Sequence, residues 1–278
     1  VFWPFAAGKT YLGLYAIAHV QGPSLVIVPT RTLVEQWEER LQRHLGRHHG
    51  VTVETYHAFD RVRKKAWKIV VFDECHRLPA NTFSRMATLH VDYRIGLSGT
   101  PYREDGRTDY IFALTGFPTG MDWHTLLEQE VFQKPDITLY TFADRKGKLR
   151  KLEELLRYPV KTLVFVDSID LGKRIAKKHE LPHVYGGTRK RLEILKEALQ
   201  VVVSRVGDEG ISLPDIRRVI EVDFLYGSRR QEAQRMGRLF HGKDPGEHII
   251  LMTERELQDY ERRLYSIYEK GWHIKIVR

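Results

Sequence analysis

The most informative segment of this chain is Lys68-Ile69-Val70-Val71-Phe72-Asp73-Glu74-Cys75-His76. Its first five residues are mostly apolar and β-branched, a pattern that predicts a buried strand. Two adjacent carboxylates follow, and α/β folds bind ligands at the carboxyl edge of their parallel strands. There Asp73 can hold Mg²⁺ through water, and Glu74 can orient a water molecule toward a phosphate. An acidic turn after a strand is the alternative interpretation.

A second motif lies upstream. Ala7-Gly8-Lys9-Thr10 leads into an apolar stretch, Tyr11 to Val20, that predicts a helix. This is the pattern of the end of a phosphate-binding loop. Backbone N–H groups at the helix start favour phosphates, Lys9 can reach them, and the Thr10 hydroxyl can ligate the Mg²⁺ that Asp73 also supports. A strand–turn–helix without a nucleotide is the alternative. The loop is unusual, because Trp3 stands where its first Gly is expected.

The order of motifs resembles the superfamily-2 helicases and translocases, and most closely the XPB-type DNA helicases. The resemblance covers nearly the whole chain. It rests on Pro29 to Trp37 (motif Ia), Asp73 to Ala80 (motif II), Ser98 to Pro101 (motif III), Arg103 to Gly106 (the R-E-D element), Thr162 to Val166 (motif IV), Asp208 to Ile211 (motif V) and Gln234 to Arg238 (motif VI).

Fold class and domains follow from the alternation of strand and helix patterns, which predicts parallel sheets with helices on both faces. Strands are expected at Leu25–Val28, Ile69–Phe72, Arg94–Leu97, Thr162–Val166, Val201–Val203, Val219–Val222 and His248–Met252. The resemblance implies an α/β protein of two tandem RecA-like domains with an ATP cleft between them. Domain 1 is expected over residues 1–142 and domain 2 over 143–278, with an amphipathic helix from Lys148 to Tyr158.

The resemblance also implies roles for individual residues. ATP and Mg²⁺ would be held by Ala7, Gly8, Lys9, Thr10, Asp73 and Gly210, with Thr10 and Asp73 as metal ligands. Glu74 would orient the attacking water, and Gln234 and Arg238 would reach the phosphates from domain 2. Nucleic acid would lie near Thr30, Arg31, Arg103, Ser204 and Arg205. The alternative for Arg31 and Arg205 is a solvated or helix-capping arginine.

Composition and charge limit the kinds of partner that we expect for this chain. The chain has 278 residues and a net charge of +9, which favours a phosphate-rich partner such as single-stranded or forked DNA. A nuclease or repair factor is a further possible partner. One cysteine excludes an intrachain disulfide and points weakly to an intracellular location. The sequence has no signal peptide pattern and no apolar run of membrane length, so no membrane partner is expected.

Departures from the family pattern leave three hypotheses. Ser212 and His241 stand where motifs V and VI usually carry Asp and Arg, so slow or partner-stimulated hydrolysis is expected. The connections at Phe142–Lys148 and Leu199–Gln200 are shorter than in the family, and the sequence begins at motif I. We therefore expect missing segments, and a truly minimal protein is the alternative. The leading hypothesis is an ATP-driven XPB-type DNA helicase or translocase in DNA repair. The alternatives are the motor fragment of a restriction-type translocase and a weakly active nucleic-acid-binding scaffold.

Overall fold

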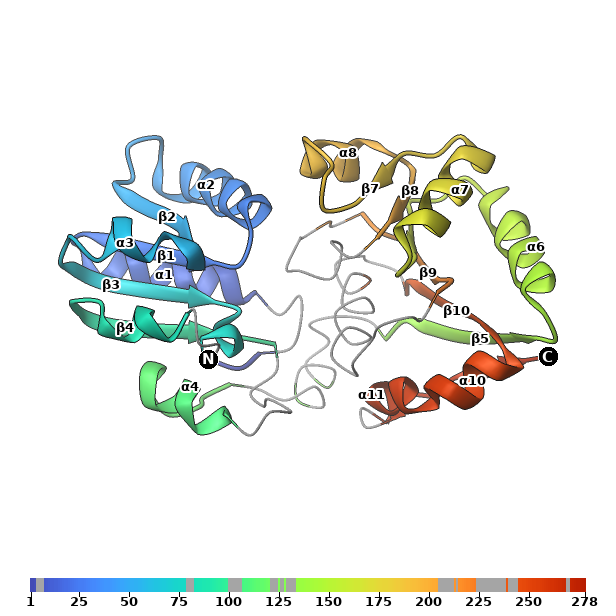
Figure 1. Cartoon of the computed structure of the whole chain (residues 1–278). Helices are drawn as coiled ribbons and strands as arrows, with labels where there is room; N and C mark the ends of the chain where they lie inside the picture. Colours follow the sequence, from blue (N-terminus) through green and yellow to red (C-terminus); the bar gives the residue numbers. More distant parts are fainter. Residues whose placement is uncertain are drawn as a thin grey trace. The chain divides into compact units, whose positions relative to one another are not determined.

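The computed structural model describes residues 1–3, 8–78, 83–99, 107–120, 125, 128, 134–204, 213, 215–223, 239, 245–268 and 271–278, with only the backbone of Ser266. The chain divides into two compact units, Val1–Asp122 and Trp123–Arg278. Figure 1 shows the first unit in blue to green and the second in yellow-green to red.

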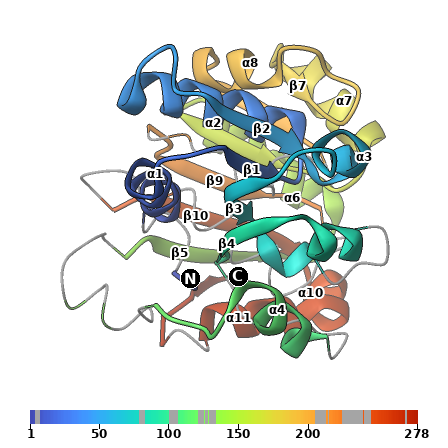
Figure 2. The same ribbon diagram turned by 90° about the vertical axis from the view of Figure 1, so that its left-hand side faces the viewer.

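The first unit alternates strands with helices. Its elements are α1 (Lys9–Val20), β1 (Ser24–Val28), α2 (Arg31–Leu45), β2 (Val51–Thr55), η1 (Tyr56–Ala58), α3 (Phe59–Val62), β3 (Trp67–Asp73), η2 (Cys75–Arg77), η3 (Ser84–Thr88), β4 (Val91–Leu97) and α4 (Thr108–Thr115). All four strands are parallel, in the order β2-β1-β3-β4 (Figure 2).

Burial on both faces explains the continuous apolar runs of the first sheet. In β1, Leu25 and Ile27 face one core, while Val26 and Val28 face the other. The second core also takes Leu14 and Ile17 of α1 and Leu33, Trp37 and Leu41 of α2. Helices α1 and α2 therefore cover the same face of the sheet, and α3 lies on the opposite face from α1 (Figure 2).

The second unit holds a larger sheet. Its elements are β5 (Asp136–Phe142), α6 (Arg145–Leu156), β6 (Thr162–Phe165), α7 (Ile169–His179), β7 (His183–Val184), α8 (Arg191–Glu197), β8 (Gln200–Val203), β9 (Arg218–Glu221), β10 (Glu247–Thr253), α10 (Glu254–Tyr260), η5 (Glu261–Leu264), α11 (Tyr265–Tyr268) and β11 (Lys275–Val277). The strands are parallel, in the order β11-β5-β10-β9-β6-β8-β7.

The seven predicted strands and the two predicted helices are confirmed, with ends shifted by up to three residues. The fold class is confirmed as α/β with two parallel sheets. The division between units falls upstream of the predicted boundary at 142/143. Strand β5 explains the difference, because it pairs with β10 along its whole length and so belongs to the second sheet. Among the described residues, no helix is long and apolar enough to cross a membrane.

Candidate nucleotide and metal site

Helix α1 begins where the phosphate-binding loop was predicted. Gly8 precedes it with φ 86°, in the left-handed region that suits glycine. The Lys9 ammonium donates to the carbonyl oxygen of Trp3 at 3.0 Å. Burial lowers the pKa of Lys9, and the charges of Glu74 and Asp73 oppose that effect. The two motifs, which are far apart in sequence, therefore lie within electrostatic reach of each other.

Asp73 is the last residue of β3, and each oxygen of its carboxylate accepts a hydrogen bond. The indole N–H of Trp37, in α2, donates to Oδ2 at 2.9 Å, and the backbone N–H of Glu74 donates to Oδ1 at 3.0 Å. The Tyr56 hydroxyl donates to the Asp73 carbonyl oxygen at 2.9 Å. Burial raises the pKa of Asp73, and the bond from Trp37 and the charge of Lys9 act against this shift. The carboxylate is thus fixed in orientation before any ligand binds.

Helix α2 also reaches the predicted metal ligand of the first motif. Arg40 donates from Nη1 to the Thr10 hydroxyl oxygen at 2.7 Å. Because Trp37 and Arg40 are three residues apart, they lie on the same face of α2. One helix face therefore contacts both residues that were predicted to ligate Mg²⁺.

Glu74 is buried and has an uncommon backbone conformation. Its φ is 51°, in the left-handed region that non-glycine residues seldom adopt. Its Oε2 lies 3.2 Å from Nδ1 of His76, and the same nitrogen lies 2.9 Å from the hydroxyl of Ser98. Leu97 is paired with Asp73 across β4 and β3, which brings Ser98, the first residue of motif III, to this site. His76 thus links the predicted water-orienting carboxylate to motif III.

The residues present fit a magnesium nucleotide. Mg²⁺ is usually held by one or two protein oxygens together with substrate phosphates, and Thr10 and Asp73 supply a hydroxyl and a carboxylate. Lys9 adds a cation at the start of a helix, where phosphates bind. The described residues contain no cluster of three or more His, Cys, Asp or Glu side chains able to hold a metal ion alone.

The predicted nucleic-acid positions of the first unit lie at the start of α2. Thr30 is the N-cap, and its hydroxyl accepts from the Leu33 backbone N–H at 3.4 Å. Arg31 begins the helix with an exposed side chain. The Thr30 side chain is therefore engaged in capping, whereas the Arg31 guanidinium faces solvent.

In the second unit, Ser204 follows β8 and is fully buried. Its hydroxyl lies 2.9 Å from Nε2 of His183. The side chain therefore connects β8 to β7, and its predicted proximity to nucleic acid stays a prediction.

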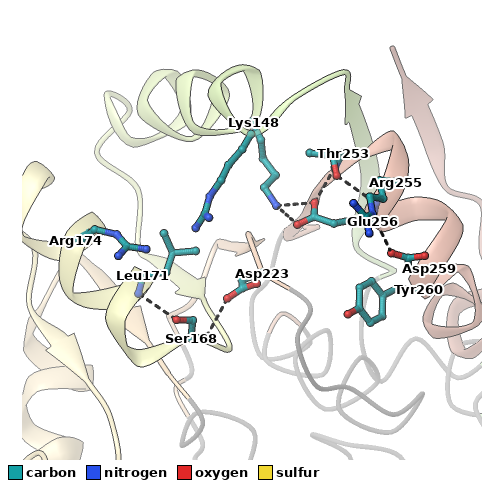
Figure 3. Close-up of a pocket in the computed structure, with 11 residues that line it drawn as sticks. Lys148, Ser168, Leu171, Arg174, Asp223, Thr253, Arg255, Glu256, Asp259 and Tyr260 are labelled. Atoms are coloured by element: carbon teal, nitrogen blue, oxygen red, sulfur yellow. Dashed lines mark hydrogen bonds and ion pairs between the residues drawn. The ribbon is translucent and has the colours of Figure 1, made fainter.

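A pocket of about 560 Å³ opens at the carboxyl edge of the second sheet. Figure 3 shows the Lys148 ammonium pointing to Glu256, whose two carboxylate oxygens both lie 2.6 Å away. The lining residues are Arg145, Lys148, Ser168, Leu171, Arg174, Asp223, Thr253, Arg255, Glu256, Asp259 and Tyr260. Arg145 and Arg174 are exposed and take part in no ion pair with the described residues.

Several predicted residues lie outside the described part of the chain. They are Ala7, Arg103, Arg205, Gly210, Ser212, Gln234, Arg238 and His241. The contacts of Trp37 and Arg40 were not predicted. Trp37 was read only as part of motif Ia, and a tryptophan on an amphipathic helix ordinarily predicts core packing. Its partner, Asp73, is 36 positions away in sequence.

Comparison with protein families gives two matches. Residues 139–271 match the family described as ERCC3/RAD25/XPB C-terminal helicase, and residues 4–103 match the family described as Type III restriction enzyme, res subunit. The Rad25 protein of Haloarcula marismortui is 33% identical over 322 residues, covering 96% of this chain and 52% of the relative. The DNA 3'-5' translocase XPB2 of Sulfurisphaera tokodaii is 27% identical, covering 92% of this chain and 78% of its own length.

The chain spans about half the length of the Rad25 relatives it matches. An alignment of 322 residues exceeds the 278 of this chain, so the Haloarcula relative has internal segments without a counterpart here.

Solved structures agree on the fold. S. cerevisiae Dbp5 bound to RNA and ADP BeF3 is similar over 99% of this chain and 84% of its own, with a TM-score of 0.77 and 15% identity. Mycobacterium smegmatis helicase Lhr, bound to ssDNA and AMP-PNP, is similar over 99% of this chain and 46% of its own, with a TM-score of 0.70 and 17% identity. Both units therefore have the RecA-like fold of these helicases. Together with the matched families and relatives, this fold means that the chain belongs to the superfamily-2 helicases and translocases of the XPB type.

Proposed function

We propose that this chain is the motor of an ATP-dependent DNA helicase or translocase of the XPB type. The observation that carries the proposal is the arrangement of Lys9, Thr10, Asp73 and Glu74, joined through Trp37, Arg40 and His76. These residue types in one site suit nucleoside triphosphate hydrolysis. Relatives named as DNA 3'-5' helicases and translocases support DNA as the track and 3'-5' as the direction.

In the proposed mechanism, each residue has a separate task. Lys9 attracts the β- and γ-phosphates, and Thr10 and Asp73 would hold the Mg²⁺ that neutralises charge on the phosphates. Glu74 accepts a hydrogen bond from the attacking water and turns it toward the γ-phosphate. His76 keeps the Glu74 carboxylate in position through its 3.2 Å contact. Gln234 and Arg238 would complete the site from the second domain, so that hydrolysis depends on domain closure.

DNA would be contacted through its phosphates. Arg31 offers a solvent-facing cation at the start of α2, and Arg103, Ser204 and Arg205 stay predicted contacts. In the second unit, Arg145 and Arg174 line the pocket of Figure 3 and have no ion-pair partner in the described residues. Such contacts position a strand without reading its sequence. A repair role and a nuclease partner remain part of the same proposal.

The test is steady-state ATP turnover with no nucleic acid, with single-stranded DNA, with forked DNA and with RNA. We expect turnover that requires Mg²⁺ and rises at least several-fold with DNA. Lys9→Ala should remove most nucleotide binding, because it deletes the cation that faces the phosphates. Lys65→Ala is the matched control, since Lys65 is exposed and lies outside the site. DNA-independent turnover, or a Lys9→Ala variant as active as the parent, would contradict the proposal.

A second candidate is the motor of a restriction-type translocase, which the match of residues 4–103 favours. The two candidates differ in the fate of the DNA. Strand displacement on a forked substrate supports the XPB-type motor. Movement along duplex DNA without displacement, measured by removal of a triplex-forming strand, would fit a translocase of either kind, and activity with a nuclease partner would then help to separate the two. A chain that binds DNA without any ATP turnover would be the scaffold.

A further inference from the structure

Arg40 contacts the oxygen atom that the proposed function assigns to Mg²⁺. Its Nη1 donates to the Thr10 hydroxyl oxygen at 2.7 Å. The carboxylate of Asp73 also interacts electrostatically with the Arg40 guanidinium. The guanidinium is therefore a permanent cation directed at both predicted metal ligands.

A guanidinium and a magnesium ion that bind the same hydroxyl oxygen repel each other. Mg²⁺ binds oxygen at about 2.1 Å, so an ion on Thr10 would lie within roughly 5 Å of the Arg40 nitrogen. Like charges at that distance repel strongly in a partly buried site, because little solvent screens them. Arginine cannot lose its proton to relieve the repulsion. Arg40 must therefore leave the Thr10 oxygen when the metal binds there.

The surroundings of Arg40 allow this movement. Its side chain is partly exposed, and it is attached to the third turn of α2 rather than to the phosphate-binding loop. Trp37, one turn earlier, stays bonded to Asp73 and keeps the helix next to the site. The same continuous helix begins at Arg31, whose exposed side chain is a predicted DNA contact. Arg40 lies nine residues after Arg31 in this regular helix, so one continuous element carries both side chains.

We propose that Arg40 competes with Mg²⁺ for the Thr10 hydroxyl, and that DNA binding at the start of α2 shifts this competition toward the metal. The proposal rests on the function proposed above and adds a regulatory residue to it. Without DNA, Arg40 holds Thr10 and raises the Mg²⁺ concentration that nucleotide binding requires. With DNA bound, the Arg40 side chain turns away from Thr10 while Trp37 stays bonded to Asp73, and the metal binds more readily. By linkage, Mg²⁺-nucleotide must strengthen DNA binding by the same factor.

The experiment compares Arg40→Met with the parent protein. Binding of a fluorescent ADP analogue is titrated against Mg²⁺, with and without forked DNA, and bound Mn²⁺ is counted by electron paramagnetic resonance. In the parent, DNA should lower the half-saturating Mg²⁺ concentration. In Arg40→Met without DNA, we expect a half-saturating Mg²⁺ concentration about tenfold lower than in the parent, which corresponds to 1.4 kcal/mol. Adding DNA to Arg40→Met should then change its half-saturating Mg²⁺ concentration very little.

Arg43→Met is the matched control. Arg43 lies three residues further along α2, is 67% exposed and pairs with Glu39 at 3.5 Å, so its loss removes the same charge without touching Thr10. The Mg²⁺ titration of Arg43→Met should match that of the parent protein. Arg40→Gln, with a shorter neutral side chain, should behave like Arg40→Met, and circular dichroism checks that both variants are folded.

Two results would overturn the inference. An unchanged Mg²⁺ titration in both Arg40 variants would mean that the guanidinium does not oppose the metal. A higher Mg²⁺ requirement would mean that Arg40 holds Thr10 in place for the metal. Either result leaves the proposed function intact if the parent protein still shows DNA-stimulated ATP turnover. If the parent binds no nucleotide at any Mg²⁺ concentration, the proposed function fails as well.

Discussion

Glu74 combines burial with a positive φ of 51°. A non-glycine residue in the left-handed region costs on the order of 1–3 kcal/mol, a cost that persists where the surroundings over-determine the conformation. Here the surroundings are the bond from the Glu74 N–H to Asp73 and the contact of its carboxylate with His76. In this conformation the Glu74 carboxylate lies beside His76, so the backbone strain occurs at the site itself.

Glu74→Gln should separate binding from hydrolysis. The amide keeps the size and most of the geometry but loses the charge that orients water, so turnover should fall at least about 100-fold. Binding of the ADP analogue should stay within a factor of about three. Glu54→Gln is the control, because Glu54 pairs with Arg61 away from the site. A Glu74→Gln variant that hydrolyses ATP at the parent rate would remove Glu74 from the mechanism.

Cys75, the next residue, should be chemically inert. Burial raises the pKa of its thiol to about 12, and the thiolate is the reactive form. At neutral pH the folded protein should therefore react with a thiol reagent far more slowly than the unfolded chain, where the cysteine has its ordinary pKa. Kinetics with a chromogenic disulfide, in buffer and in guanidinium chloride, measure both rates. Fast labelling of the folded protein would show that Cys75 is accessible.

At the scale of elements, the site depends on how closely α1 and α2 pack. Gly13 of α1 has no room for a side chain: a Cβ there would lie 2.8 Å from Cη2 of Trp37 and 3.3 Å from Leu97 and Val71. The glycine thus lets the indole approach α1 and still donate to Asp73. Gly13 and Trp37 therefore set the contact between the two helices, and through Trp37 they also set the orientation of Asp73, the predicted metal ligand.

Gly13→Ala should lower stability although alanine favours helix. The gain in helix propensity is at most about 1 kcal/mol, whereas overpacking typically costs 1–3 kcal/mol. We expect a lower melting temperature, together with weaker Mg²⁺-nucleotide binding because Trp37 is displaced. Trp37→Phe removes the ring atom that the new methyl meets, so the stability cost of Gly13→Ala should be smaller in a Trp37→Phe background than in the parent. Differential scanning calorimetry of the single and double variants provides the measurement, and a more stable Gly13→Ala would contradict the packing argument.

At the scale of the whole molecule, the net charge of +9 favours binding to a polyanion. Phosphate contacts release counterions, so DNA affinity should fall steeply with salt and depend little on sequence. A dissociation constant that stays flat between low and moderate salt would argue against a phosphate-binding surface.

We expect Arg145 and Arg174, which line the pocket of the second unit, to form part of a phosphate-binding surface. The double variant Arg145→Gln with Arg174→Gln should weaken DNA binding and reduce the salt slope by about one for each lost contact. The control is Arg150→Gln with Lys177→Gln, which removes two exposed charges from the same helices, α6 and α7, outside the pocket lining. Fluorescence anisotropy over a salt series measures both. Equal slopes for the two double variants would show that only overall charge matters.

Sequence patterns were enough to predict the α/β class, the order of helices and strands around the motifs, and the family. These depend on local patterns: β-branched runs buried on both faces, a glycine before a helix, and carboxylates at a strand end. Strands with a weaker pattern were not predicted. In β5 only Ile137 and Leu139 are buried, and the strand belongs to the second sheet because of its pairing with β10, more than a hundred residues later.

The side-chain contacts of the site could be seen only in the folded chain. The contacts of Trp37 with Asp73, Arg40 with Thr10 and His76 with Ser98 join segments that are distant in sequence. Each partner has an ordinary local interpretation, as core tryptophan, surface arginine or turn histidine. Their pairing follows from the parallel order of the strands and from the packing of α1 and α2 on one face of the sheet. Local sequence patterns specify neither the strand order nor the helix packing, because both depend on groups that lie far apart in sequence and meet only in the folded chain.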